Sequence, residues 1–227
     1  MKKIGFIGTG LMGFPMAKNI LKSGYKLKAF NRTLSKVKAL DEFGAEIAIT
    51  LSELVKDSEI IITMLTDDDA IDEVMGSLNF LDNLKPGSIV IDMSSIKPIT
   101  AKKHEKNLSL KKIKYLDAPV SGGTVGAEDG SLAIMIGGEK KVFKEVEDLL
   151  KTMGNPTLVG PVGSGQVSKL ANQIIVGLTI GAVAEAITLC EKAGADPNKM
   201  ISALSVSYTH LRAHETGRNL VCRLLLE

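Results

Sequence analysis

A lysine and an asparagine at the start of a long apolar stretch have the residue types and spacing needed for proton transfer. Lys169 follows the glycine-rich segment 160–165, and Asn172 lies three residues later, on the same face of a predicted helix. Partial desolvation and a nearby helix N-terminus both lower the pKa of a lysine, so its ammonium group can donate a proton. The alternatives are a surface lysine that covers apolar neighbours and an asparagine that bonds another helix. Because polar residues are otherwise sparse here, we favour Lys169 as a catalytic residue, with Asn172 orienting it or contacting substrate.

Histidine offers no competing proton donor in most of the chain. Only His104 precedes residue 206, and it lies among lysines and a glutamate in segment 101–107. That composition is typical of the solvated face of a helix, so we expect His104 to be structural or solvated. A reaction that builds negative charge on an oxygen atom needs a positioned acid, and in this part of the chain Lys169 is the candidate that remains.

A second segment with suitable chemistry is Asp117–Gly123, which follows a predicted strand. Its glycines, Gly122 and Gly123, leave backbone N–H groups free to face an anion, and Ser121 adds a hydroxyl group. A substrate carboxylate fits such a loop. An ordinary strand-to-helix turn would use the same residues, and the loop alone favours that simpler interpretation.

The N-terminus carries the spacing of a dinucleotide-binding turn. An apolar strand over 2–8 leads into a G-x-G-x-x-G motif and then a helix over 14–22. Gly8 permits the tight turn, Gly10 lets the backbone approach a pyrophosphate, and Gly13 lets the helix pack closely on the strand. The helix start offers N–H groups and partial positive charge to the phosphates. The candidate cofactor residues in this motif are Gly8, Thr9, Gly10, Leu11, Met12 and Gly13.

The second predicted strand, 26–31, ends in Asn31-Arg32-Thr33 rather than in a carboxylate. An acidic residue there would bind the ribose hydroxyls of NAD, whereas Arg32 can pair with the 2′-phosphate of NADP. Asn31 and Thr33 can donate hydrogen bonds to the same phosphate. We therefore favour NADP and keep NAD as possible. The alternative is a solvated Arg32 with Thr33 as the N-cap of the next helix.

The rest of the first 161 residues alternates between strand and helix patterns. Strands are predicted at 46–49, 59–65, 88–94, 114–120 and 132–136, and helices at 51–55, 68–75, 98–109 and 140–153. This alternation indicates an α/β fold of Rossmann type, with a doubly wound, largely parallel sheet covered on both faces. Ligands of such sheets bind beyond the carboxyl ends of the strands. Met64-Leu65-Thr66 and Ser94-Ser95 lie at strand ends and are therefore expected to border the nicotinamide ribose, while Asp67-Asp68-Asp69 is predicted to be a helix cap.

Composition excludes several classes of protein. The 227 residues are 44% hydrophobic and 24% charged with a formal net charge of +2, and aromatic residues make up 4%. Scattered lysines and few aromatics argue against a nucleic-acid partner. Cys190 and Cys222 have no metal-binding or disulfide spacing. The apolar stretch 170–189 is long enough to span a membrane, but its polar residues favour a buried helix of a soluble, cytoplasmic protein.

The segment 206–227 differs from everything before it. It holds two of the three histidines and a cluster of arginines in a chain that otherwise prefers lysine. It closely resembles the in-frame translation of a transposase-type sequencing adapter, so we leave it out of fold reasoning. A genuine surface helix is the alternative. We expect three parts: a nucleotide-binding domain at 1–161, a long interdomain helix with the truncated start of a helical domain at 162–204, and a non-native tail at 205–227.

Together these motifs resemble the β-hydroxyacid dehydrogenases, the family of 3-hydroxyisobutyrate dehydrogenase, tartronate semialdehyde reductase and the glyoxylate/succinic semialdehyde reductases. The likeness covers about residues 1–204. It implies that segment 117–123, with Ser121, Gly122 and Gly123, is the substrate loop, that Lys169 is the catalytic lysine and that Asn172 contacts substrate. It further implies that the residues named above at 8–13, 31–33, 64–65 and 95 bind the coenzyme.

Within the family, segments 169–176 and 192–196 are most similar to the tartronate semialdehyde (2-hydroxy-3-oxopropionate) reductases. Segment 31–33 is closer to the NADP-using semialdehyde reductases. The resemblance implies reduction of a small semialdehyde acid to a hydroxy acid, with 3-hydroxyisobutyrate or succinic semialdehyde chemistry as the alternative. Lys169 argues against imine reduction, and a non-catalytic NADP-binding sensor remains open.

Family members continue into an all-helical domain that covers the long helix and forms a homodimer or homotetramer. With that domain cut short, apolar residues such as Ile174, Leu178 and Leu189 lack cover. We therefore expect the chain as printed to be poorly soluble or inactive.

Overall fold

The computed structural model describes residues 2–207, which divide into two compact units, one ending at Lys169 and one starting at Leu170. The strands are β1 (Ile4–Ile7), β2 (Leu27–Phe30), β3 (Glu46–Ile47), β4 (Ile60–Thr63), β5 (Ile89–Asp92), β6 (Lys114–Asp117), β7 (Val120–Ser121), β8 (Leu132–Gly137) and β9 (Gly154–Gly160). The helices of the first unit are α1 (Gly13–Lys22), α2 (Ser35–Lys38), the 3-10 turn η1 (Asp41–Phe43), α3 (Leu51–Asp57), α4 (Asp68–Met75), α5 (Leu78–Leu81), α6 (Pro98–Ser109), α7 (Gly123–Asp129) and α8 (Lys140–Lys151). Helix α9 (Ser164–Lys192) crosses the boundary between the units, and α10 (Pro197–Ser207) follows it.

The sheet of the first unit has the strand order β3-β2-β1-β4-β5-β6-β8-β7, and β9 pairs with β8. The first six strands in this order are all parallel. Strands β2 and β3 follow β1 on one side, and after β3 the chain crosses to the other side of β1 to form β4, which creates a switch point between β1 and β4. That order defines the Rossmann-type fold, in which ligands bind outside the carboxyl ends of the strands at the switch point. The predicted α/β fold is therefore confirmed.

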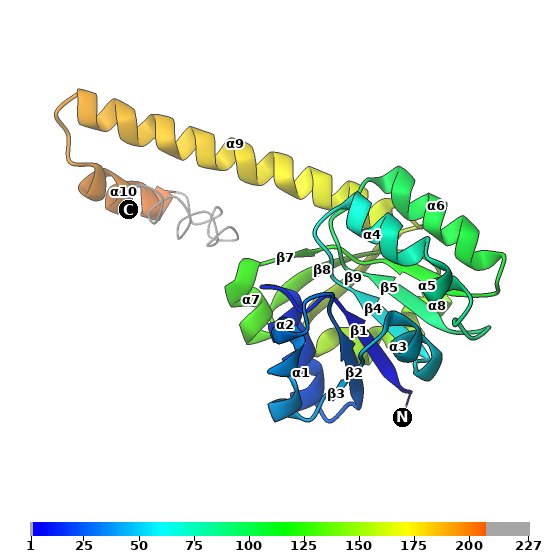
Figure 1. The fold of residues 1–227 in the computed structure, drawn as a ribbon. Coiled ribbons are helices and arrows are strands. Elements are labelled where there is room, and N and C mark those ends of the chain that lie inside the picture. The colour runs from blue at the N-terminus through cyan, green and yellow to red at the C-terminus, as the bar shows by residue number, and fades with distance from the viewer. Residues whose placement is uncertain (1, 208–227) are drawn as a thin grey trace. The chain divides into compact units, whose positions relative to one another are not determined.

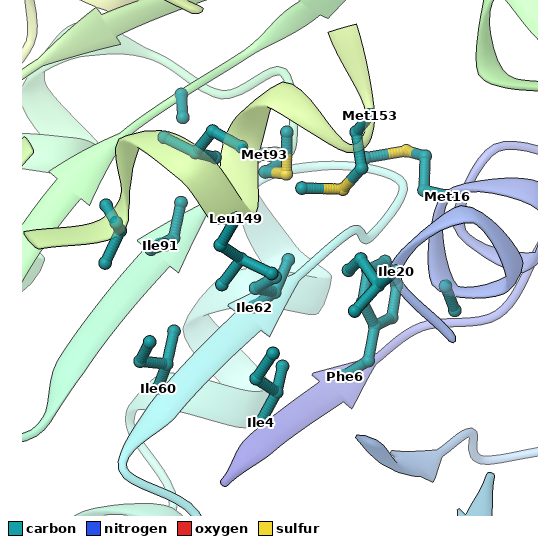
Figure 2. Packing of buried hydrophobic residues seen from close by; sticks show 14 of the residues in the cluster. Ile4, Phe6, Met16, Ile20, Ile60, Ile62, Ile91, Met93, Leu149 and Met153 are labelled. Carbon is teal, nitrogen blue, oxygen red and sulfur yellow. The ribbon is translucent and has the colours of Figure 1, made fainter. Parts of the chain in front are cut away.

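Helices cover both faces of this sheet (Figure 1). The central strands β1, β4 and β5 are buried at every position, as strands covered on both sides must be. Alternate residues face opposite layers. In Figure 2, Phe6, Ile62 and Ile91 of the sheet pack against Met16 and Ile20 of α1 and Leu149 of α8. On the other face of the sheet, a second cluster of buried hydrophobic residues packs the strands against α3, α4, α5 and α6.

The edge of the sheet beyond β6 differs from the prediction of one strand over 114–120. Strand β6 ends at Asp117, and the chain then forms the short β7, which pairs antiparallel with β8. Pro119 lies at the break, where it has no N–H to donate to a ladder. Strand β9 was not predicted. It contains Pro156 and flanking glycines, which weaken a strand pattern but are tolerated at an edge position beside β8.

Helix α9 does not have the burial expected of it. It is long enough to cross a membrane, and an 18-residue stretch of it has a mean hydropathy of 1.8, yet only 6% of that stretch is buried. Ile174, Leu178 and Leu189 are exposed, so the interpretation as a buried helix is wrong for this chain, while the expectation of uncovered apolar residues is confirmed. One such helix is weak evidence for a membrane span, and the absence of a membrane partner stays a prediction.

Candidate active site

The glycine-rich turn after β1 has the geometry that its sequence predicted. Gly8 has φ +96°, and an added Cβ there would collide with the Met64 carbonyl oxygen. A Cβ on Gly13 would collide with the Gly8 carbonyl oxygen. At Gly10, by contrast, an added Cβ meets no atom within 4 Å. The turn is therefore closed toward the protein and open at Gly10, as a pyrophosphate approaching the backbone requires, so these residues fit a dinucleotide.

Asn31 holds this turn in place. Its Oδ1 accepts a hydrogen bond from Thr9 N at 3.1 Å, and its Nδ2 donates to Thr33 O at 3.0 Å. The Thr9 hydroxyl donates to Lys36 O at 3.1 Å, and Thr9 is buried. The side chain of Asn31 thus joins the end of β2 to the phosphate-binding turn. This observation assigns Asn31 a positioning role that the sequence did not suggest.

Arg32 extends into solvent beside this turn. Its side chain is 89% exposed, and its Nη1 lies 3.7 Å from Glu73 Oε2, an exposed pair of little energetic value. The guanidinium is therefore available to an incoming phosphate. Thr33 is exposed, and helix α2 has Leu34 as its N-cap, so the alternative of Thr33 as that cap is wrong.

The ends of β4 and β5 meet next to the glycine-rich turn. Met64 N donates to Ile7 O at 2.9 Å, and Leu65 N donates to Ser94 Oγ at 2.9 Å. Thr66 and Ser95 are exposed at these strand ends. Asp67 caps α4 by accepting from Ala70 N at 2.9 Å, which confirms the predicted cap. The strand ends thus gather the predicted residues 8–13, 64–66 and 95 along one edge of the first unit.

Two buried carboxylates lie side by side at this edge, since Asp92 and Asp117 are partners in the register of β5 and β6. Asp92 Oδ1 accepts from Thr63 Oγ1 at 2.9 Å and from Ser94 N at 3.0 Å, and Tyr115 Oη lies 3.3 Å from its Oδ2. Burial raises the pKa of Asp92 to about 6, although these hydrogen bonds oppose the shift. Sequence reasoning missed Asp92, because it reads as the last residue of an apolar strand.

Replacement of Asp92 by asparagine is expected to reduce the change in the free energy of unfolding with pH. The pKa of Asp92 is raised from 3.8 to about 6, so the folded state holds the proton more tightly than the unfolded chain does. The free energy of unfolding should therefore fall by roughly 3 kcal/mol as pH rises from about 3 to about 7. Urea unfolding of both proteins across this range measures the slope. An unchanged slope in Asp92→Asn would contradict the assignment.

The second carboxylate fastens the first turn of α9. Asp117 Oδ1 accepts from Gly163 N at 2.7 Å, and Oδ2 accepts from Gln166 N at 2.9 Å. The Gln166 side chain accepts from Ile96 N at 3.1 Å and donates to Ser94 O at 2.9 Å. These contacts join β5, β6 and α9 within the first unit.

Lys169 lies one turn beyond Gln166 on the same face of α9. It is half-buried, and burial alone lowers its pKa below the ordinary value of 10.5. Lost solvation disfavours the charged ammonium form relative to the neutral amine. The geometry agrees with the sequence-based candidate, and the catalytic role itself stays a prediction. Asn172 follows three residues later in the same helix, beyond the boundary of the first unit.

The segment Ser121–Gly123 forms the turn between β7 and α7. Ser121 pairs with Ala133 of β8, and Gly122 and Gly123 have φ +138° and +63°. Glycine suits both angles, since side-chain-bearing residues rarely adopt them. The glycines thus have a sufficient structural reason, and their role in binding substrate stays a prediction.

His104 is not on a solvated face. It is 3% exposed on the inner side of α6, and its Nε2 lies 2.7 Å from Asp72 Oδ1. Burial lowers the pKa of His104, while Asp72 opposes that shift. The expectation of a structural residue agrees with this position, and the expectation of solvation is wrong.

The fold and the open glycine turn define a dinucleotide-binding protein, and comparison with known proteins identifies its family. Residues 3–177 match the family described as the NAD binding domain of 6-phosphogluconate dehydrogenase. Residues 163–221 match the family described as NAD-binding of NADP-dependent 3-hydroxyisobutyrate dehydrogenase. The chain belongs to the β-hydroxyacid dehydrogenases, NAD(P)-dependent oxidoreductases that act on CH–OH groups. The proposed adapter tail, which the second match overlaps, lies outside the described residues apart from its first positions and stays a prediction.

Three relatives illustrate the likeness. The 2-hydroxy-3-oxopropionate reductase of Escherichia coli is 41% identical, with 97% of this chain and 76% of that protein covered. The solved Mycobacterium tuberculosis 3-hydroxyisobutyrate dehydrogenase with L-serine has a TM-score of 0.85 at 28% identity, covering 90% of this chain and 70% of that one. A structure of Psf3 with NADP+ and 2-OPP has a TM-score of 0.82 at 26% identity, with 89% and 72% covered. Membership of this family makes the chain a hydroxyacid dehydrogenase that uses a nicotinamide coenzyme.

Proposed function

We propose that this protein reduces 2-hydroxy-3-oxopropionate to glycerate with NADPH and that Lys169 supplies the proton. The observation that carries the proposal is the state of Lys169: half-buried, with its pKa lowered by burial alone, on the helix fastened to the strand ends. A lysine in this state exchanges a proton more readily near neutral pH than one in solvent.

In this mechanism the reduced nicotinamide, when bound, supplies the hydride to the aldehyde carbon. The carbonyl π pair moves to oxygen, and Lys169 Nζ transfers its proton to that oxygen, which leaves a neutral amine that takes a proton from water. The turn at Gly8–Gly13 would hold the pyrophosphate, and Met64, Leu65, Thr66 and Ser95 would border the nicotinamide ribose. Ser121, Gly122, Gly123 and Asn172 are proposed to bind the carboxylate and hydroxyl of the substrate.

The choice of substrate is supported by the 41% identity to the E. coli 2-hydroxy-3-oxopropionate reductase across nearly the whole chain. The alternative is a 3-hydroxyisobutyrate dehydrogenase or a glyoxylate/succinic semialdehyde reductase, because relatives with the former name are also similar. These substrates share a carboxylate and a carbonyl group a few atoms away, so one site can serve either class.

A substrate panel tests the proposal in a form of the protein whose own reading frame continues past Leu204. Oxidation of NADPH is followed with 2-hydroxy-3-oxopropionate, methylmalonate semialdehyde, succinic semialdehyde and glyoxylate. We expect the highest kcat/KM with the first. A higher kcat/KM with any of the other three would contradict the proposed substrate while leaving the reaction class intact.

Arg32 is proposed to select NADPH over NADH. Replacement by aspartate removes the exposed guanidinium and adds a charge that repels the 2′-phosphate. The ratio of kcat/KM for NADPH to that for NADH should fall roughly 10- to 100-fold, the value of one charged hydrogen bond. Arg32→Ala should give a smaller fall in the ratio because it adds no repulsion. A preference for NADH in the unaltered protein would contradict this assignment.

A further inference from the structure

We propose that Asp117 and Gln166 are positioning residues for Lys169, because they clamp the first turn of α9 to the ends of β5 and β6. The inference rests on the proposed function, in which Lys169 donates the proton. It assigns these two buried side chains a role in the reaction although neither needs to touch substrate.

Asp117 accepts hydrogen bonds from the backbone N–H groups at the start of α9. The first N–H groups of an α-helix have no partner within the helix, and they carry partial positive charge. One carboxylate accepts from Gly163 N at 2.7 Å and Gln166 N at 2.9 Å, and Gly165 N–H also contributes to its stabilisation. Bonds between a charged acceptor and amide donors are stronger than neutral ones, so this turn is held more firmly than an ordinary helix start.

The surroundings of Asp117 fit a carboxylate closely. An added Cβ on Gly165 would lie 2.8 Å from Asp117 Oδ2 and would collide with Met135 O. An added Cβ on Gly137 would collide with Asp117 Oδ1 and lie 2.8 Å from Pro161 O. Glycines on both sides thus let the backbone close around a fully buried carboxyl group. Burial raises the pKa of Asp117 against the effect of the amides. Its ionisable neighbours are Asp92, its register partner in β5, and Tyr115, two residues earlier in β6.

Gln166 provides the second attachment. Its amide bonds both ways with the backbone after β5, at Ser94 O (2.9 Å) and Ile96 N (3.1 Å), and its side chain is buried. Lys169 lies three residues further along, so the face that Gln166 turns toward the end of β5 also carries Lys169. Rotation or fraying of this turn would move the ammonium group. A misplacement of about 1 Å can lower a rate by about 10²-fold.

Asp117→Asn is the direct test, because asparagine keeps the size of the side chain but presents an NH₂ group to a backbone N–H. We expect faster hydrogen exchange of the amides of Gly163–Gln166 and a fall in kcat of roughly 10- to 100-fold. The Kd for NADPH should stay within about twofold, because the glycine turn of β1 is untouched. The control is Ser77→Ala, which removes the cap of α5, where Phe80 N donates to Ser77 Oγ at 3.2 Å, between α4 and β5. Equal kcat in the two variants would overturn the proposal.

A second readout follows Lys169 itself. The rate of its reaction with an amine-reactive reagent, resolved by mass spectrometry over a pH series, gives its pKa without reference to activity. In Asp117→Asn that pKa should rise toward 10.5 as the freed side chain becomes solvated, whereas general loss of structure elsewhere would not single out Lys169. An unchanged pKa would contradict the clamp.

Gln166→Met serves if Asp117→Asn fails to fold, since methionine has similar length and lacks both bonds. The same upward shift in the pKa of Lys169 and a smaller fall in kcat are expected, and the absence of both would overturn the proposal. Lys169→Ala, measured in parallel, separates the two ideas. Full activity of that variant contradicts the proposed function, whereas an unshifted Lys169 in the clamp variants contradicts only the positioning role.

Discussion

Lys169→Ala is expected to lower kcat for aldehyde reduction by roughly 10³-fold, which lies within the range for loss of a general acid. The Kd for NADPH should stay within about twofold, because the side chain is proposed to meet the reacting oxygen rather than the phosphates. Stopped-flow reduction and fluorescence titration with NADPH measure the two quantities separately. The kcat of Lys169→Met, which keeps the apolar stem of the side chain, should fall by a similar factor. Loss of packing would then not explain the result.

The matched control for Lys169→Ala is Lys22→Ala, an exposed lysine in the last turn of α1, which should change neither quantity. The pH profile adds a signed test. Reduction requires the protonated lysine, so kcat should decline as pH rises through a pKa that burial holds below 10.5. Undiminished turnover in Lys169→Ala would end the proposed mechanism. A sensor without catalysis would instead show NADPH binding and no turnover in the unaltered protein.

Short-range patterns predicted the part of the site that lies on the nucleotide side. The glycine spacing at 8–13 sits between one strand and one helix, so its geometry follows from neighbouring residues alone. The same holds for Asp67 as the cap of α4, whose bond spans three residues. Lys169 was identified because it is a rare polar residue at the start of an apolar helix.

The network that holds Lys169 could not be predicted in this way. Asp117 bonds Gly163 across 46 residues, and Gln166 bonds Ser94 across 72, so only the folded sheet brings these groups together. Asp92 and Asp117 end their strands as single acids after apolar runs, which reads locally as the exit from the core. Their partnership depends on the register of β5 and β6.

The burial of His104 follows from a local pattern in the sequence of α6. The buried residues of α6 are Thr100, Ala101, His104 and Leu108, a spacing of one, three and four that marks a single inner face. The flanking lysines and glutamate dominated the interpretation of segment 101–107 as solvated. The position of His104 on the apolar face of the helix predicts burial better than the average polarity of its neighbours does.

Gly13→Ala is expected to impair stability and Gly10→Ala to impair coenzyme binding, although both replace a glycine of one motif. An added methyl group at residue 13 collides with the Gly8 carbonyl oxygen, which is backbone and cannot turn aside, so stability should fall by about 3 kcal/mol or more. At residue 10 the methyl group meets no atom within 4 Å, and the free energy of unfolding should change by less than about 0.5 kcal/mol.

Binding of NADPH reverses that order of sensitivity. The open space at Gly10 is where the pyrophosphate is proposed to approach the backbone, so Gly10→Ala should weaken binding about tenfold or more in a protein that remains fully folded. Urea unfolding and titration with NADPH on the same preparations give both quantities, and each variant controls for the other. Tight binding by Gly10→Ala would contradict the placement of the pyrophosphate. Unchanged stability of Gly13→Ala would show that the helix does not pack against the turn as closely as the structure has it.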